Sequence, residues 1–293
     1  MVTFPDDSEI SSLKDLWKAC FPEDSEFCDF YFEHCFRNDH CLVYSGESGI
    51  ESAFYWFDGF LNTGTQRLPV IFLYAGATYK QYRSKGNIYK MFEKITEYCR
   101  QRNIAAFVLS ALNTSKGVSE RFGLSPDIVL RETVVKKPSC SNCEIKPQKC
   151  SLEDFKRLRK ISVDDCENSI GWSDYDLEFM YRELNFSGEI ISLELDGKKH
   201  YAVISEDEEA ETLLVKETDV PADKLQLLAE SVFCFKSDYK AMKILTRPND
   251  IPDCLETESS RLVYYAHVYY VLDTPEIKAA REKGELYINL TAE

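Results

Sequence analysis

Residues 71–91 read IFLYAGATYKQYRSKGNIYKM: an apolar segment, then a short basic loop, then the start of a helical pattern. Gly86 in the loop allows a tight turn and a close backbone approach. The following helix directs its free N–H groups and the positive end of its dipole at the loop, and Arg83 and Lys85 add positive charge. The stretch therefore predicts an anion site that fits a diphosphate.

A helix is predicted over residues 87–103, directly after this loop. Its apolar side chains recur at spacings of three and four, which gives a face that can pack on a sheet. These side chains are Ile88, Met91, Phe92, Ile95 and Tyr98.

The loop Arg83-Ser84-Lys85-Gly86-Asn87-Ile88 resembles the acetyl-CoA-binding motif of the GNAT family of N-acetyltransferases. A strand at 105–110, then Asn113, then a helix through Ser119 that ends at Phe122-Gly123-Leu124, is similar to the family's second signature. Each match alone is also typical of an ordinary strand-to-helix turn. The two in the right order favour the family.

The resemblance implies acetyl-CoA as co-substrate and direct attack of an acceptor amine on the thioester. Backbone N–H groups along Gly76–Thr78 would hold the pantetheine arm and polarise the thioester oxygen, the loop would hold the pyrophosphate, and Asn113 would bond the pantetheine. The implied cofactor-binding residues are Gly76, Ala77, Thr78, Arg83, Ser84, Lys85, Gly86, Asn87, Ile88 and Asn113.

Three departures from the family pattern leave the acid and base open. Ile88 stands where Gly or Ala is usual, Ser119 stands where many members carry a Tyr that protonates the thiolate, and residues 68–78 hold no carboxylate. We consider Glu51 as the base, against a strand-edge carboxylate that faces water. Tyr74 is considered as an acid or substrate contact, against plain aromatic core. The terminal carboxylate of Glu293 is a third option.

The first half predicts helices at 11–21 and 25–36, then an antiparallel meander at 41–44, 52–60 and 68–78, and a last strand at 128–135. The aromatic run at 54–60 is interpreted mainly as a strand buried on both faces. Pro138 and Pro147 mark a boundary between 136 and 150.

The second half repeats this order. Ser12-Leu13-Lys14-Asp15-Leu16 returns as Ser151-Leu152-Glu153-Asp154-Phe155, and elements follow at 174–185, 189–194, 201–205, 211–216, 221–235 and 241–246. Its strand-to-helix junction, residues 217–223, holds no Gly and no base, and Asp219 and Asp223 there are interpreted as capping residues. We predict an α/β (α+β) fold of two tandem GNAT-like domains. Residues 1–138 bind acetyl-CoA, and residues 147–293 are a diverged, non-catalytic copy.

Composition excludes some partners. The 293 residues are 44% hydrophobic and 29% charged, and the net charge of -15 disfavours nucleic acid and anionic lipid and favours a cationic small acceptor. No apolar run approaches the ~20 residues that cross a bilayer.

The 11 cysteines are read as reduced thiols of a cytoplasmic protein. Cys140, Cys143 and Cys150 could hold a metal, but no fourth ligand follows, so no metal is expected. The four histidines are assigned no chemistry.

These patterns predict an acetyl-CoA-dependent N-acetyltransferase that acts as a monomer on a small-molecule amine. The alternatives are an acyl-CoA-binding or sensing protein without turnover, and a transferase of an aminoacyl or longer acyl group.

Overall fold

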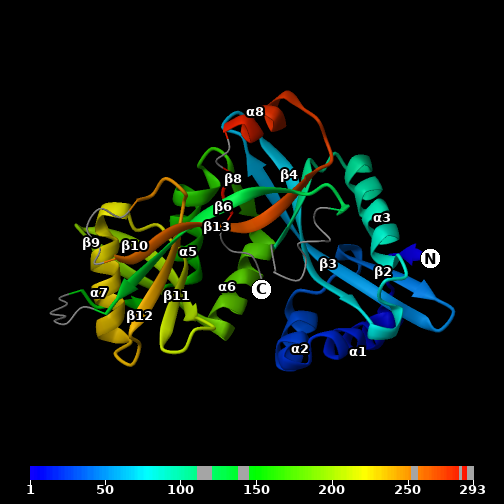
Figure 1. Cartoon of the computed structure of the whole chain (residues 1–293), viewed down its shortest axis with the longest axis horizontal. Helices are drawn as coiled ribbons and strands as arrows, with labels where there is room; N and C mark the ends of the chain where they lie inside the picture. The colour runs from blue at the N-terminus through cyan, green and yellow to red at the C-terminus, as the bar shows by residue number, and fades with distance from the viewer. Residues whose placement is uncertain (111–120, 138–144, 252–256, 284–285, 289–293) are drawn as a thin grey trace.

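The computed structural model describes residues 1–110, 121–137, 145–251, 257–283 and 286–288 (Figure 1). Their strands form one mixed, mostly antiparallel sheet of 13 strands, in the order β1-β2-β3-β4-β5-β13-β6-β12-β11-β10-β9-β7, with β8 paired to β3. The parallel pairs are β4 with β5 and β11 with β12. The predicted α/β class with a sheet flanked by helices is confirmed.

The first half follows the predicted order. Its helices are α1 (Ile10–Cys20), α2 (Ser25–His34) and α3 (Asn87–Gln101), and its strands are β1 (Val2–Thr3), β2 (Cys41–Gly46), β3 (Gly49–Asn62), β4 (Arg67–Thr78), β5 (Ala106–Ser110) and β6 (Ser125–Lys136). β2, β3 and β4 form the expected antiparallel meander.

Helices cover both faces of this half. Trp17 of α1 and Tyr31 of α2 pack on one face, and Met91 and Ile95 of α3 pack on the other. β3 alternates between the two cores, so that its odd-numbered aromatics face α1 and α2 and its even-numbered ones face α3. These side chains are Tyr55 and Phe57, and Phe54 and Trp56. The aromatic run at 54–57 is thus a strand buried on both faces.

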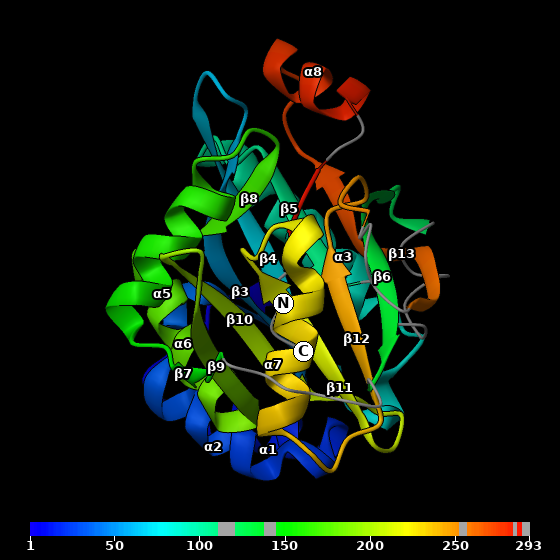
Figure 2. The same ribbon diagram turned by 90° about the vertical axis from the view of Figure 1, so that its left-hand side faces the viewer.

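The second half repeats the layering. Its strands are β7 (Gln148–Lys149), β8 (Ser169–Trp172), β9 (Gly188–Leu195), β10 (Lys198–Glu206), β11 (Thr212–Thr218), β12 (Ala241–Thr246) and β13 (Thr257–Tyr270). Its helices are α5 (Leu152–Arg159), α6 (Asp174–Ser187), α7 (Leu225–Phe235) and α8 (Pro275–Lys283). Figure 2 shows α7 on one face of the sheet and α5 and α6 on the opposite face.

Two strands join the halves. β13 is the last of the described strands along the chain, yet it pairs with β5 of the first half, while β6 pairs with both β13 and β12. In Figure 1 these two long strands cross the middle of the molecule side by side. Each half therefore continues its sheet with a strand from the other.

A second set of strand pairings also joins the two halves. β8 pairs with the end of β3, the segment Leu286–Ile288 meets β8 at Ser169, and Leu286 meets β6 at Ile128. Leu286 and Ile288 are buried in the same core as Trp172 and Val108. Pairing thus runs in a closed circuit through β3, β4, β5, β13, β6, residues 286–288 and β8.

The structure differs from the predicted organisation at this point. Two central sheets were expected, whereas the described strands form one sheet that both halves share. β8 and α8 were not foreseen, and the helix expected at 221–235 begins as a short 3-10 turn at Ala222–Lys224 before α7. The division at 138 and 147 stays a prediction.

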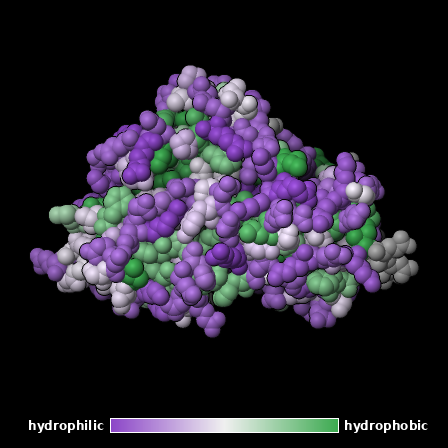
Figure 3. All heavy atoms as spheres, turned by 180° about the vertical axis from the view of Figure 1, so that it is seen from behind, coloured by the Kyte–Doolittle hydropathy of each residue, from purple (hydrophilic) through white to green (hydrophobic). Residues whose placement is uncertain are grey.

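The surface is mostly polar where it can be seen. The back face in Figure 3 is dominated by hydrophilic residues, with hydrophobic ones in small separate groups. Among the described residues, the helices are too short or too polar to cross a membrane.

Candidate functional site

The basic loop between β4 and α3 has the backbone of an anion site. Gly86 lies in the left-handed region with φ 82° and is the N-cap residue of α3, and Ser84 has φ 63°. A Cβ added at Gly86 would meet no atom within 4 Å, so conformation rather than crowding requires glycine, and the space beside it is open. Arg83, Ser84 and Lys85 are exposed around it.

The start of α3 is not neutralised by a side-chain cap. Its N-cap makes no side-chain hydrogen bond, its first turn holds no acidic residue, and the Lys90 amide is the first that bonds within the helix, to the Gly86 carbonyl oxygen at 3.3 Å. α5 and α6, by contrast, are capped by Ser151 and Ser173 and carry acidic first turns. The positive end of α3 is thus available to an anion.

A polar network fixes this loop to the sheet. The Nε of Arg83 donates to the carbonyl oxygen of Thr78 at 3.1 Å. Asn87, only 4% exposed, donates to Oε2 of Glu51 at 2.9 Å and to Oγ of Ser52 at 3.3 Å. Thr78 also donates to Ser52 at 3.1 Å. The end of β4, the start of β3 and the start of α3 are therefore held together.

β4 carries a bulge near its end. Ala53 pairs with Ala77 and Tyr55 pairs with Tyr74, so Ala75 and Gly76 together face one residue of β3. Ala75 takes φ 44°, and Gly76 is exposed with open space at its Cα. The parallel pairing of β4 with β5 runs from Val70 to Leu73, and the bulge follows it. Exposed backbone at this point could bind an extended amide or a carbonyl oxygen.

The comparisons with known proteins agree with this geometry. Residues 3–126 match the family model described as an acetyltransferase (GNAT) domain. This part of the chain is a GNAT domain. It covers α1, β4, the basic loop and α3, and it indicates acyl-CoA-dependent acyl transfer, so the chain is an acyltransferase.

Solved structures show the same fold over nearly the whole chain. A probable N-acyltransferase of Enterococcus faecalis has a TM-score of 0.73 at 15% identity, over 92% of this chain and 72% of its own. A GCN5-related N-acetyltransferase of Anabaena variabilis has a TM-score of 0.73 at 12% identity, over 93% and 73%. N-myristoyltransferase of Saccharomyces cerevisiae, with bound myristoyl-CoA, has 0.56 at 12%, over 92% and 78%. A comparison with curated protein sequences found no match.

Glu51 and Tyr74, the two predicted catalytic residues, are not brought together. Glu51 bonds Asn87 at the loop end of the GNAT domain, and its carbonyl oxygen accepts from the amide of Tyr79. Tyr74 lies beside the bulge, with its ring 5.2 Å from Phe57 and 5.8 Å from Tyr31. Burial, and then the charge of Glu183, raise the pKa of Tyr74 well above its ordinary value. It is therefore a neutral phenol that can donate a hydrogen bond.

The predicted backbone and loop residues, in contrast, do lie together. Gly76, Ala77 and Thr78 form the end of β4, and Arg83–Ile88 follow as the loop and first turn of α3. Ile88 is half-buried. Asn113, Ser119, Cys140, Cys143 and Glu293 lie outside the described residues. Among the residues described, no three His, Cys, Asp or Glu side chains gather as metal ligands.

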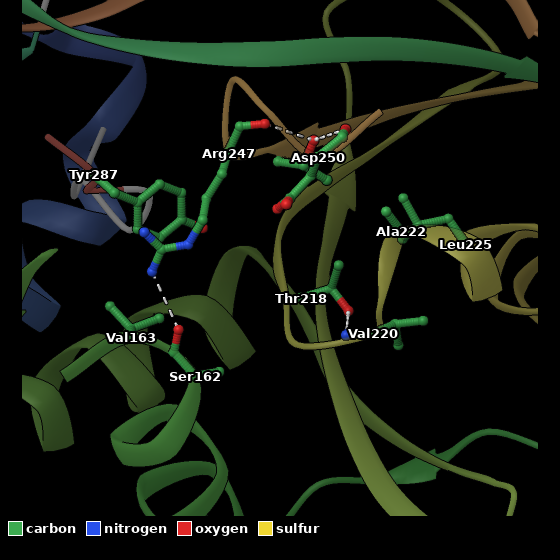
Figure 4. A pocket seen from close by; sticks show the side chains of 10 residues that line it. Ser162, Val163, Thr218, Val220, Ala222, Leu225, Arg247, Asp250 and Tyr287 are labelled. Atoms are coloured by element: carbon green, nitrogen blue, oxygen red, sulfur yellow. Dashed lines mark hydrogen bonds between the residues drawn. The ribbon is translucent and has the colours of Figure 1, made fainter. Parts of the chain in front are cut away.

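The corresponding junction of the second half is closed. There the end of β11, the start of α7 and the end of β12 surround a cavity of ≈ 30 Å³, lined by Thr218, Leu225, Arg247 and Tyr287 among others. Figure 4 shows Arg247 lying against Tyr287, with 4.1 Å from the guanidinium carbon to the ring centre. Arg247 also bonds Ser162 and Ser169. The space admits a water-sized group and not a nucleotide.

Two features near Tyr74 were not predicted from the sequence. The bulge at Ala75 and Gly76 could have been suspected from a glycine inside a strand pattern. Glu183, whose charge reaches Tyr74, lies in α6 more than a hundred residues away, and nothing in its local sequence marks it.

Proposed function

We propose that the chain transfers an acetyl group from acetyl-CoA to an amine by direct attack. The observation that carries the proposal is the uncapped start of α3 at Gly86, next to Arg83 and Lys85, on the segment that follows the exposed bulge near the end of β4. An anion site and an exposed strand backbone on one segment suit a cofactor with a diphosphate at one end and a thioester at the other.

The implied residues take separate roles. The amides of Gly86–Ile88 and the side chains of Arg83 and Lys85 hold the pyrophosphate. The backbone of Gly76, Ala77 and Thr78 holds the pantetheine arm, and an amide at the bulge polarises the thioester oxygen. Asn113 stays a predicted pantetheine contact. Tyr74, as a neutral phenol, would donate to the departing sulfur.

The second half is proposed not to bind the cofactor. Its junction at 217–223 has no Gly and no base, and the stacked Arg247 and Tyr287 leave a cavity of only ≈ 30 Å³. We assign it the wall of the acceptor site instead. The overall charge of -15 favours a small cationic amine as acceptor.

A thermal-shift titration with acetyl-CoA tests the cofactor site. At a hundredfold excess over the dissociation constant, binding to the folded state adds about 2.7 kcal/mol, which raises the melting temperature by several degrees. We expect this rise in the wild type and its loss in Arg83→Ala and Gly86→Glu.

Matched controls are available in the second half. Gly197 has φ 72° and open space at its Cα, as Gly86 does, and Arg157 is an exposed arginine. Gly197→Glu and Arg157→Ala should keep the stabilisation. A wild-type chain that no acyl-CoA stabilises would refute the proposal, and binding without amine-dependent thiol release would favour the acyl-CoA-sensing alternative.

A further inference from the structure

One face of α6 is turned toward the GNAT domain. Asp176, Phe179, Glu183 and Phe186 are spaced by three, four and three residues, so they share one side of the helix. Three of them contact residues of the first half. The contacts are Asp176 Oδ2 with the amide of Asp58 at 2.8 Å, Phe179 with the ring of Phe57 at 5.4 Å, and Phe186 with the ring of Phe30 at 5.1 Å. Glu183 lies between the second and the third.

These contacts show the direction in which α6 runs along β3. The helix rises about 10 Å over the seven residues from Asp176 to Glu183, and β3 covers about 10 Å over the three residues from Asp58 to Tyr55. Tyr55 is the pairing partner of Tyr74, which directly precedes the β4 bulge. As α6 runs from Asp176 to Phe179 its contacts move from Asp58 to Phe57, so Glu183 follows in the direction of Tyr55 and Tyr74.

The surroundings of Glu183 agree with this placement. Its charge is the largest influence on Tyr74 after burial. Glu183 is 4% exposed and Tyr74 7%, so both are nearly enclosed. The rings of Trp17, Tyr31 and Phe57 lie 5.2–5.8 Å from the ring of Tyr74. Ser187 donates to Oε1 of Glu183 at 3.2 Å, which holds the carboxylate from its own helix. Asp24 and the thiol of Cys35 also act on the pKa of Tyr74, although burial raises the pKa of Cys35 and so keeps this thiol neutral.

We propose that Glu183 of the second half is the general base that receives the acceptor's ammonium group and takes its proton. The proposal rests on the acetyl transfer proposed above. An alkylamine with a pKa of ~10.4 is almost fully protonated at neutral pH, so it needs such a group before it can attack. A buried carboxylate attracts a cation by its charge, and the rings beside Tyr74 add the attraction of their quadrupoles.

The step balances as follows. Glu183 takes one proton from the ammonium, and the free amine forms a C–N bond to the thioester carbonyl carbon. The C–S bond then breaks, and the second nitrogen proton goes to the leaving sulfur, with Tyr74 donating a hydrogen bond to it. The products are an amide, the free thiol of CoA and one proton, which Glu183 returns to solvent.

Thiol release from acetyl-CoA with two probe amines tests the assignment. n-Butylamine is protonated at neutral pH, whereas hydroxylamine is not, so only the first needs a base. We expect Glu183→Gln to lower kcat/KM for n-butylamine by about 10²–10⁴-fold at neutral pH. The remaining rate should rise roughly tenfold per pH unit, because without the base only the free amine reacts, whereas the wild-type rate should level off once Glu183 is ionised. The reaction with hydroxylamine and the KM for acetyl-CoA should stay within a few fold of the wild type.

Further variants decide between this base and others. Glu178 lies on the same helix and pairs with Lys156 at 2.6 Å, so Glu178→Gln should behave as the wild type. The assignment is wrong if Glu51→Gln, and not Glu183→Gln, changes the n-butylamine profile to this tenfold rise per pH unit, or if Glu183→Gln slows both amines equally. It is also wrong if the wild type is stabilised by acetyl-CoA but releases no thiol with either amine. Failure of acetyl-CoA to stabilise the wild type would instead refute the proposed function itself, and with it this role.

Discussion

His40 is held between two carboxylates at the edge of the first half. Its Nδ1 lies 2.7 Å from Asp39 and its Nε2 lies 2.7 Å from Asp58. Burial lowers the pKa of His40, but the hydrogen bonds to Asp58 and Asp39 outweigh it, so the net shift is upward. The Asp58 amide also donates to Asp176 of α6. The protonation of one histidine thus bears on a contact between the halves.

The stability of the protein should depend on pH through His40. Because its pKa is higher in the folded state, the stabilisation is fully present below the unfolded value of ~6.5 and is lost as pH rises through the folded value. Denaturant titrations on both sides of this window should show the free energy of unfolding falling with pH. His40→Gln should flatten the fall, and an unchanged slope in that variant would contradict the assignment.

At the residue scale, sequence patterns predicted best where the chemistry is local. Gly86 and Arg83 could be placed because a turn, a charge and a helix start lie within a few residues of each other. Glu51 could be placed on its strand, but not at Asn87, since that contact spans 36 residues. Asp219 was interpreted as a cap, whereas it accepts from the amide of Tyr201 on the neighbouring strand. This interpretation was wrong because strand pairing brought in a donor that local sequence does not reveal.

At the scale of elements, α5 is joined to β10 and β11 by a buried ionic cluster. Arg159 has no exposed surface, and its Nε donates to Glu217 at 3.0 Å while its Nη1 donates to Asp164 at 2.9 Å. The hydroxyl of Tyr201 donates to the same Glu217 at 2.7 Å. Glu217 and Asp164 share the guanidinium of Arg159 as their counter-ion.

Removing that charge should be costly. We expect Arg159→Met to lower the free energy of unfolding by about 3–5 kcal/mol, since it leaves Glu217 buried without its counter-ion. The double variant Arg159→Met, Glu217→Gln should recover part of the loss. Urea unfolding of both variants measures this, with Arg157→Ala as the exposed control. A loss below about 1 kcal/mol in the single variant would show that the cluster tolerates the change.

Elements with a clear periodicity of apolar residues were predicted well, and elements that exist through long-range strand pairing were not. α1, α3, β4 and β12 lie within one or two residues of their expected bounds. β8 has four residues, all buried, and exists because it pairs with the end of β3 more than a hundred residues away. Short strands of this kind leave no periodic signal.

At the scale of the whole molecule, the exchange of β6 and β13 makes the halves interdependent. Without β13, β5 would present an open edge in the middle of the sheet, and β6 would lose its longest partner. The closed circuit through β8 and residues 286–288 ties the same strands together again. The two predicted domains could be recognised as a repeat, but their shared sheet could not, because the exchange changes no local pattern.

A fragment experiment tests this dependence. Residues 1–146 contain the whole GNAT domain match, yet we expect this fragment to aggregate or to unfold without a cooperative transition. Co-expression with residues 147–293 should restore one cooperative transition, followed by circular dichroism. A lone fragment that is monomeric, melts cooperatively and is stabilised by acetyl-CoA would contradict the expectation.

The late position of β13 also imposes an order in time. The chain between the end of β5 at Ser110 and the start of β13 at Thr257 is 257 − 110 = 147 positions long. At about 5–20 residues per second, a ribosome needs roughly 7–30 s to cross it. During that interval β5 of the nascent first half has no strand on its outer side, and its sheet is completed only after β13 has emerged.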